Sequence, residues 1–155
     1  MNVPAEAGIF NLKFINMIQR IQSIWLMMAA AACFLTLKLP FYNGNAVQDD
    51  QTKLFEPLTA MSNIWLMILT FLLGTGIVIL IFLFKDRKLQ IKLTFLAIVL
   101  SIVNIVLFFE QIKKFVEGSF DITSPIVFTV PIFLILAVRG MYKDEKLIKS
   151  LNRLR

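Results

Sequence analysis

The side chains best suited to a directed chemical contact lie near the two ends of the chain. Gln19, Arg20 and Gln22 stand at the start of a long apolar run, and Asp144 and Glu145 follow the last such run. An arginine offers five donors in a planar fork that matches the two oxygens of a carboxylate. One interpretation of the arrangement is a bidentate contact from Arg20 to Asp144 or Glu145, or to an acid of a partner.

The alternative for Arg20 is an interfacial anchor, a role that lysine performs equally well. Arg153 and Arg155 complete the candidate interaction residues. Segment 143–155 places leucine and isoleucine on one side and basic residues elsewhere. This pattern is typical of an amphipathic helix that lies on anionic lipid or docks on a partner. Two alternatives thus remain for Arg20, a directed contact or an anchor, and two remain for the tail, anionic lipid or a partner.

The composition excludes most familiar catalytic chemistry. The chain has no histidine, which excludes His-ligated zinc, bis-His haem and His-dependent hydrolytic triads. It has one cysteine, Cys33, which excludes an internal disulfide, a Cys-x-x-Cys redox pair and an iron–sulfur ligand set. We therefore predict a protein that is not an enzyme and that has no cofactor and no metal site.

The remaining composition indicates a membrane protein. Apolar residues make up 58% of the 155 positions and charged residues 17%, against about 25% charged in soluble domains. A span of a bilayer requires about 20 predominantly apolar residues. The sequence predicts an all-α integral membrane protein in which four transmembrane helices form an antiparallel bundle over residues 17–155. The predicted spans lie near residues 21–39, 62–84, 92–110 and 124–142.

Lysine and arginine are distributed unequally between the two predicted sides. Two lie in the N-terminal segment, four lie between the second and third spans, and six lie in the tail, so twelve of the sixteen share one side. Such residues are concentrated in cytoplasmic loops. The bias predicts a multi-pass protein of the bacterial inner (cytoplasmic) membrane with both termini in the cytoplasm. We expect no nucleic-acid partner, because no aromatic–basic interleaving accompanies the charge.

The first span has a competing interpretation as a cleaved or lipidated leader. Residues 30–33 read Ala-Ala-Ala-Cys, which weakly resembles a lipoprotein cleavage box. The apolar run continues to Leu37, where a mature N-terminus should become polar. An uncleaved span is therefore favoured. Residues 1–16 are expected to be an extension or a start-site artefact, with Met17 as the alternative start.

Small and weakly polar residues at heptad spacing predict the helix faces that meet, because lipid gives helices no hydrophobic reason to associate. Pro131 should also kink the fourth span. Asn104 could contact a ligand or an ion, but an interhelical hydrogen bond is favoured. The loop from Lys38 to about Met61 shows no sustained helix or strand pattern. The predicted packing residues are Ala29, Cys33, Gly74, Gly76, Ser101, Asn104 and Pro131.

Two end motifs carry a family resemblance. Met-Ile-Gln-Arg-Ile-Gln-Ser opens the first span at residues 17–23, and Lys-Asp-Glu-Lys-Leu at residues 143–147 precedes a terminal Arg-Leu-Arg. The combination resembles an uncharacterised family of small four-span inner-membrane proteins of Bacteroidota, domain-of-unknown-function family 4293. The resemblance implies the four-span layout and no activity. Leu151 and Asn152 depart from the Ala-Asp that the resemblance leads one to expect there.

Two functions remain. The first is a non-catalytic accessory or assembly subunit of a larger membrane complex, whose partners are the lipid bilayer and a membrane protein or a second copy of the chain. The alternative is a component of a small-molecule or ion transporter or channel. The alternative is weakened because no acidic or basic residue lies in the middle of a predicted span, and Lys38, Lys92, Glu110 and Arg139 stand at or near the span ends.

Overall fold

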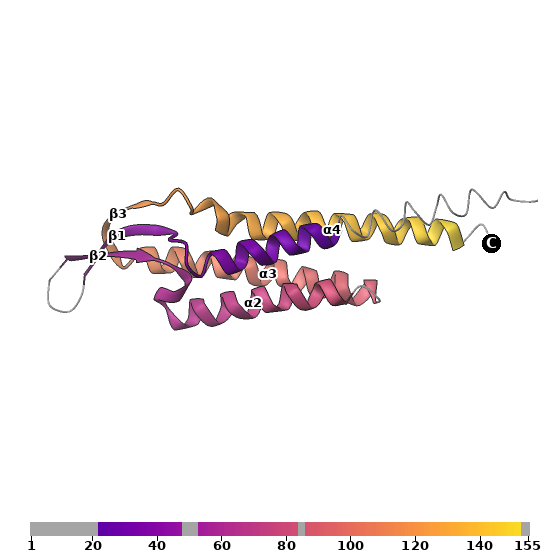
Figure 1. The fold of residues 1–155 in the computed structure, drawn as a ribbon, viewed down its shortest axis with the longest axis horizontal. Coiled ribbons are helices and arrows are strands. Elements are labelled where there is room, and N and C mark those ends of the chain that lie inside the picture. The colour runs from indigo at the N-terminus through magenta and orange to yellow at the C-terminus, as the bar shows by residue number, and fades with distance from the viewer. Residues whose placement is uncertain (1–21, 48–52, 84–85, 153–155) are drawn as a thin grey trace, which may run out of the picture.

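The computed structural model describes residues 22–47, 53–83 and 86–152, and these are mostly helical. The first helix is described over Gln22–Leu35. It is followed by α2 (Ile64–Phe82), α3 (Arg87–Ile112) and α4 (Pro125–Asn152). Figure 1 shows the helices side by side, with the strands gathered at one end. We call this end the sheet end, and the end where α2 stops and α3 begins the turn end.

The long helices coincide with the charge-poor apolar runs. Within the described residues, three helices are long and apolar enough to cross a membrane, namely α2, α3 and α4 over Pro125–Lys146. At about 1.5 Å rise per residue, the 19 residues of α2 cover about 28 Å, close to the hydrocarbon thickness of a bilayer. Local signals set the starts of two helices. Asn63 accepts a hydrogen bond from the Trp65 amide (2.9 Å), and Pro125 occupies the first position of α4.

Two helices are longer than the predicted spans. The helix α3 begins at Arg87, five residues before the predicted start at residue 92, because basic residues end an apolar run without ending a helix. The helix α4 continues through Pro131 and on to Asn152. Most of the predicted amphipathic tail is therefore a direct continuation of the fourth apolar run.

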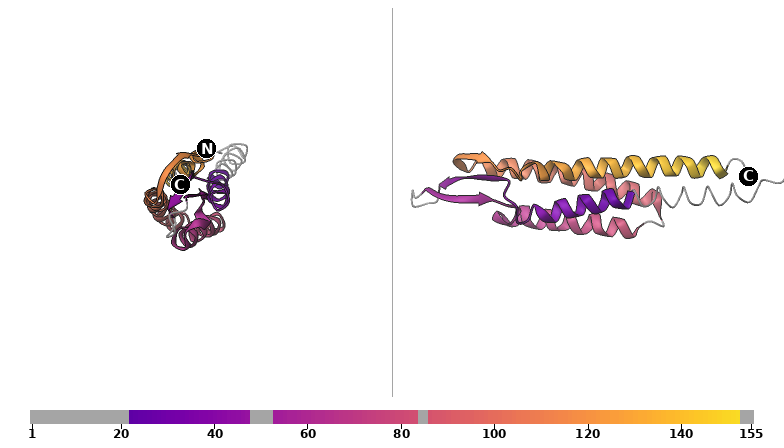
Figure 2. Two further views of the ribbon diagram at one scale, coloured as in Figure 1. Left: turned by 90° about the vertical axis from the view of Figure 1, so that its left-hand side faces the viewer. Right: turned by 45° about the horizontal axis from the view of Figure 1, so that its top comes forward.

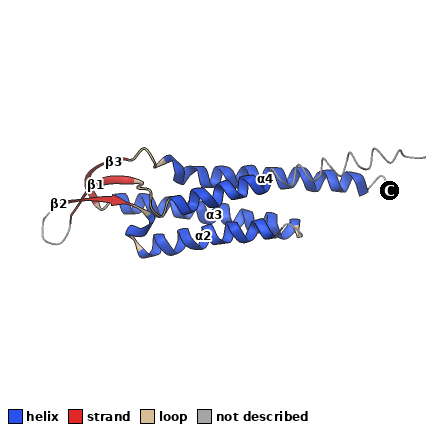
Figure 3. Cartoon of the chain, in the orientation of Figure 1, coloured by secondary structure: helices blue, strands red, loops and turns tan. Residues whose placement is uncertain are grey.

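A three-stranded antiparallel sheet covers the sheet end (Figure 3), so the expectation of a purely α-helical chain was wrong. Its strands are β1 (Tyr42–Val47), β2 (Lys53–Leu58) and β3 (Phe115–Phe120), in the order β2-β1-β3. The expectation of no strand in the first loop was also wrong. Pairing with β3, about 70 residues away, completes the ladder of β1, and no local pattern encodes such a contact.

Two glycines allow the close approach of β1 and β3. Gly44 lies opposite Gly118 in the register. A Cβ on Gly44 would stand 2.5 Å from the backbone oxygen of Glu117, and a Cβ on Gly118 would stand 2.5 Å from that of Asn43. Side chains at either position would therefore push the two strands apart.

The core has two parts, one within the helices and one under the sheet. The first is built on small and branched residues such as Ala29, Ile77 and Leu134, all fully buried. The second is centred on Phe41, whose ring is 4.9 Å from that of Phe108, centroid to centroid. End-on and tilted views show the helices gathered around a common axis, with the strands at one end (Figure 2).

Heptad faces of small residues lie in the helical part of the core. On the first helix, every member of the face is buried, namely Gln22, Leu26, Ala29, Cys33 and Thr36. On α3 the buried members are Thr94, Ala97, Ser101, Asn104 and Phe108, whereas Gln111 is half-buried. On α2 the buried members are Thr70, Gly74 and Ile77, whereas Asn63 and Met67 are half-buried.

Gly74 and Gly76 lie two residues apart on α2 in different surroundings. A Cβ at Gly74 would stand 3.1 Å from the ring of Phe34, whereas a Cβ at Gly76 would meet nothing within 4 Å. Among the described residues, Gly76 therefore makes no close contact with a neighbouring helix, unlike Gly74. We expect Gly74→Leu to lower the free energy of unfolding in detergent by about 1–3 kcal/mol through overpacking. Gly76→Leu should leave it unchanged or raise it, and equal thermal midpoints for the two variants would contradict this packing.

Asp121 ties the sheet to the start of α4. Its carboxylate accepts hydrogen bonds from the Thr123 amide (3.0 Å), the Thr123 hydroxyl (2.9 Å) and the Asn43 side-chain amide (2.5 Å). These bonds, that of the Thr123 amide above all, hold the pKa of Asp121 below its ordinary value. The carboxylate thus joins β1 to the segment that leads into α4.

The lowered pKa of Asp121 predicts a pH dependence of stability. A group whose pKa is lower in the folded state stabilises that state above its unfolded pKa, about 3.9. This contribution is lost as the pH falls through the folded pKa. We expect the thermal midpoint in detergent to fall as the pH is lowered from about 5 to 3, and to fall less steeply in Asp121→Asn. An identical slope for the variant and the parent would show that Asp121 does not contribute.

Candidate functional site

Three helices meet in a polar cluster at the turn end. Asp144 of α4 is buried and accepts a hydrogen bond from the side-chain amide of Gln22, which is itself buried at the start of the described part of the first helix. The Nη1 atom of Arg87, the first residue of α3, lies 3.8 Å from Oδ2 of Asp144. One carboxylate therefore contacts residues from two other helices. We call Gln22, Arg87 and Asp144 the Asp144 cluster.

A glycine makes room for this cluster. Gly140 precedes Asp144 by one helical turn on the same side of α4. A Cβ on Gly140 would lie 3.0 Å from Cγ of Gln22, tighter than ordinary contact. The absence of a side chain at Gly140 thus lets Gln22 reach the carboxylate.

The ion pair in the Asp144 cluster is incomplete. The separation of 3.8 Å is too long for a hydrogen bond. Nη1 of Arg87 is buried and donates to no acceptor among the described residues. A buried donor without an acceptor costs free energy, so Arg87 depends on the charge of Asp144 for its stabilisation at this position.

The structure describes three of the seven predicted interaction residues. It brings Gln22 and Asp144 together and places Glu145 next in the helix, half-buried. The other four predicted residues, Gln19, Arg20, Arg153 and Arg155, lie outside the described residues. The predicted contact from Arg20 therefore stays a prediction.

Arg87 is the residue that sequence reasoning missed. In the sequence, Arg87 is one of the four basic residues between the second and third predicted spans, and this pattern predicts only the orientation. A signal was present, because the predicted topology brings the start of the third span and the end of the fourth to the same side. A basic residue at the start of the third span could therefore have been paired with an acidic residue just after the fourth span.

Weakly polar side chains also pair inside the bundle. The Cys33 thiol donates to the backbone oxygen of Thr70 (3.3 Å), and the Thr70 hydroxyl donates to Oδ1 of Asn104 (3.1 Å). The contacts link the first helix to α2 and α2 to α3, and Asn104 is thereby engaged within the chain. Of the other predicted packing residues, Ala29, Gly74 and Ser101 are buried, and Pro131 is half-buried.

No group of three or more histidine, cysteine, aspartate or glutamate side chains that could hold a metal occurs in the part of the chain described here. The Asp144 cluster contains one carboxylate, one amide and one guanidinium. These groups are suited to orienting helices or binding a charged group.

The fold and the cluster define a class of protein: a helical protein with three helices long and apolar enough to cross a membrane. The chain belongs to the family described as "Domain of unknown function (DUF4293)", whose model matches residues 18–154. Membership of the family that the two end motifs indicate is thereby confirmed. No curated protein and no solved structure gives a significant match to the chain.

Proposed function

We propose that the chain is a four-span protein of the bacterial inner membrane, with both termini in the cytoplasm, and that it acts without catalysis. In this proposal it is an accessory or assembly subunit of a larger membrane complex. The turn end carries the contact with the partner.

The sheet supports the proposed topology. Because β1 pairs with both β2 and β3, the segment before α2 and the segment after α3 lie on one side of any membrane that the helices cross. The helices α2 and α3 then cross as a hairpin. The turn end holds exposed lysines at 88, 92, 143 and 146, which fits the cytoplasmic side.

The observation that carries the accessory role is the continuation of α4 beyond the Asp144 cluster. The helix runs eight residues past Asp144, about 12 Å, and in Figure 1 it extends beyond the ends of α2 and α3. We call residues 145–152 the α4 arm. Because Asp144 contacts Gln22 and Arg87, the root of the arm is fixed relative to the bundle. A helix held in this way presents a defined surface at little cost in entropy.

A photo-crosslinking amino acid at Lys146, exposed on the α4 arm, tests the proposal in membranes of the native host. We expect a discrete crosslink to another membrane protein, identified by mass spectrometry. Its yield should fall when Asp144→Ala releases the root of the arm. The matched position is Ile122 at the sheet end, 96% exposed, which should not give this product. Crosslinks confined to lipid or to the chain itself, or the same product from both positions, would refute the role.

A further inference from the structure

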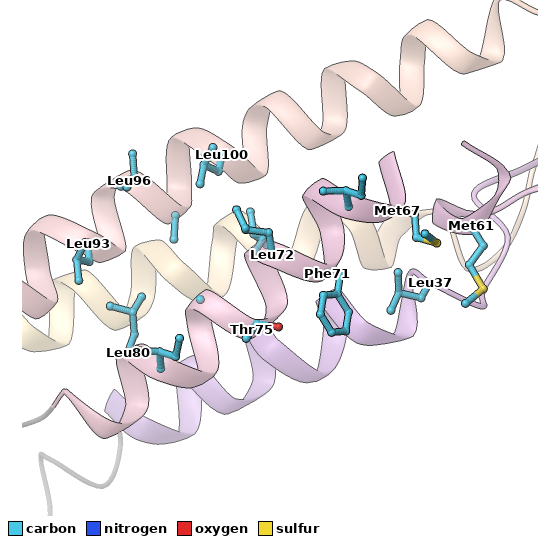
Figure 4. Close-up of a pocket in the computed structure, with 15 residues that line it drawn as sticks. Leu37, Met61, Met67, Phe71, Leu72, Thr75, Leu80, Leu93, Leu96 and Leu100 are labelled. Carbon is cyan, nitrogen blue, oxygen red and sulfur yellow. The ribbon is translucent and has the colours of Figure 1, made fainter. Parts of the chain in front are cut away.

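An apolar groove of about 720 Å3 runs along α2 and α3 (Figure 4). Leu72 and Ile79 of α2 border it on one side, and Leu93 and Leu96 of α3 border it on the other. Gly76 adds depth, because a Cβ at this position would meet no atom within 4 Å. The volume lies within the range of about 300–1,000 Å3 that is usual for small-molecule sites.

The border of the groove favours a flexible apolar occupant over a helix. Helices pack in membranes through stretches of small residues that let the backbones approach. Here the border carries large and well-exposed side chains, Phe71 (58%), Leu72 (58%) and Leu96 (54%). Such side chains keep a second helix at a distance, whereas an acyl chain can fit between them.

Positive charge continues the line of the groove at the turn end. On α3, Lys92 lies one helical turn before Leu96, and Lys88 lies one turn before Lys92, each step being offset by about 40° around the helix. Leu96 and Leu100 line the groove, and the two lysines are exposed beyond its end. Asp86 is the one acid within residues 86–92, beside Arg87, Lys88 and Lys92, and Asp144 and Glu145 of α4 stand at the same end beside Lys143 and Lys146, which leaves an excess of positive charge.

We propose that the groove binds an acyl chain of an anionic phospholipid whose phosphate is held by Lys88 and Lys92. Basic side chains beside crevices between membrane helices bind anionic headgroups in this way. The apolar side chains of the groove contact the acyl chain of the lipid. The ammonium groups of Lys88 and Lys92 bind its phosphate at the turn end of the groove. This site is separate from the Asp144 cluster and the α4 arm, so it does not depend on the accessory role.

The test is native mass spectrometry of the full chain in detergent, titrated with phosphatidylglycerol and, separately, with phosphatidylcholine of the same acyl chains. We expect one phosphatidylglycerol to be retained per chain, more tightly than phosphatidylcholine. Lys88→Gln and Lys92→Gln should each weaken the retention about fivefold. Gly76→Leu should abolish it, because the new side chain fills the groove without meeting backbone.

Two variants serve as matched controls. Lys113→Gln removes the same charge at the sheet end, and Val106→Leu enlarges an exposed apolar residue of α3 that does not line the groove. Both should retain the lipid as the parent does. Equal retention of the two lipids, or no effect of Gly76→Leu, would overturn the proposal. A dimer that forms without lipid and is lost in Gly76→Leu would instead assign the groove to a second copy of the chain.

Discussion

Phe41→Ala is expected to lower the free energy of unfolding by about 3–5 kcal/mol, the usual cost of removing a buried aromatic side chain. Phe41 is 1% exposed and stands at the junction of the first helix and β1. Its ring centroid is also 5.8 Å from those of Phe109 and Phe120, and 6.1 Å from that of Phe128. One ring thus joins α3, β3 and α4.

Phe55→Ala is the matched control, because Phe55 lies in β2 with 70% of its surface exposed. Chemical unfolding in a fixed detergent should separate the two variants clearly, with Phe55→Ala close to the parent. If Phe41→Ala lost no more stability than Phe55→Ala, the sheet would not be packed on the helices as described.

Asp144→Ala is expected to cost about 2–3 kcal/mol of stability. The substitution removes the acceptor of the Gln22 amide and the carboxylate that lies 3.8 Å from the Arg87 guanidinium. Hydrogen bonds to charged groups contribute about 1.5–3 kcal/mol, and a buried group left without a partner adds its desolvation cost. Arg87 is 21% exposed at its side chain, so water relieves part of its loss.

A double-mutant cycle with Arg87→Gln isolates the ion pair, because the two changes should cost less together than the sum of the single changes. Asp86→Ala is the matched control at the same end. Asp86 is exposed and makes no side-chain cap to α3, so its removal should change stability by no more than about 0.5 kcal/mol. Strict additivity in the cycle would show that Arg87 and Asp144 do not interact.

Helix positions and packing faces were accessible from the sequence because both depend on local periodicity. Charge-free runs locate α2 and α3, and small residues at heptad spacing mark buried positions such as Ala29 and Ser101. Gly76 shows the limit of that rule, because a small residue borders a groove as readily as it borders a helix.

The sheet and the Asp144 cluster were not accessible in the same way. Pairing of β1 with β3 joins two loops separated by two helices, and the Asn-Gly-Asn run in β1 is typical of a turn. Arg87 and Asp144 are 57 positions apart, and their pairing follows from the helix arrangement. The family resemblance places the chain in its family but adds no contact.

The most direct test of the proposed topology is labelling by a membrane-impermeant maleimide in spheroplasts. Cys33, which is buried, is first replaced by alanine, and single cysteines are introduced as Ile122→Cys at the sheet end and Lys88→Cys at the turn end. The four-span topology predicts that Ile122→Cys is labelled in intact spheroplasts and that Lys88→Cys is labelled only after lysis. Labelling of Lys88→Cys in intact spheroplasts, or protection of Ile122→Cys there, would contradict it.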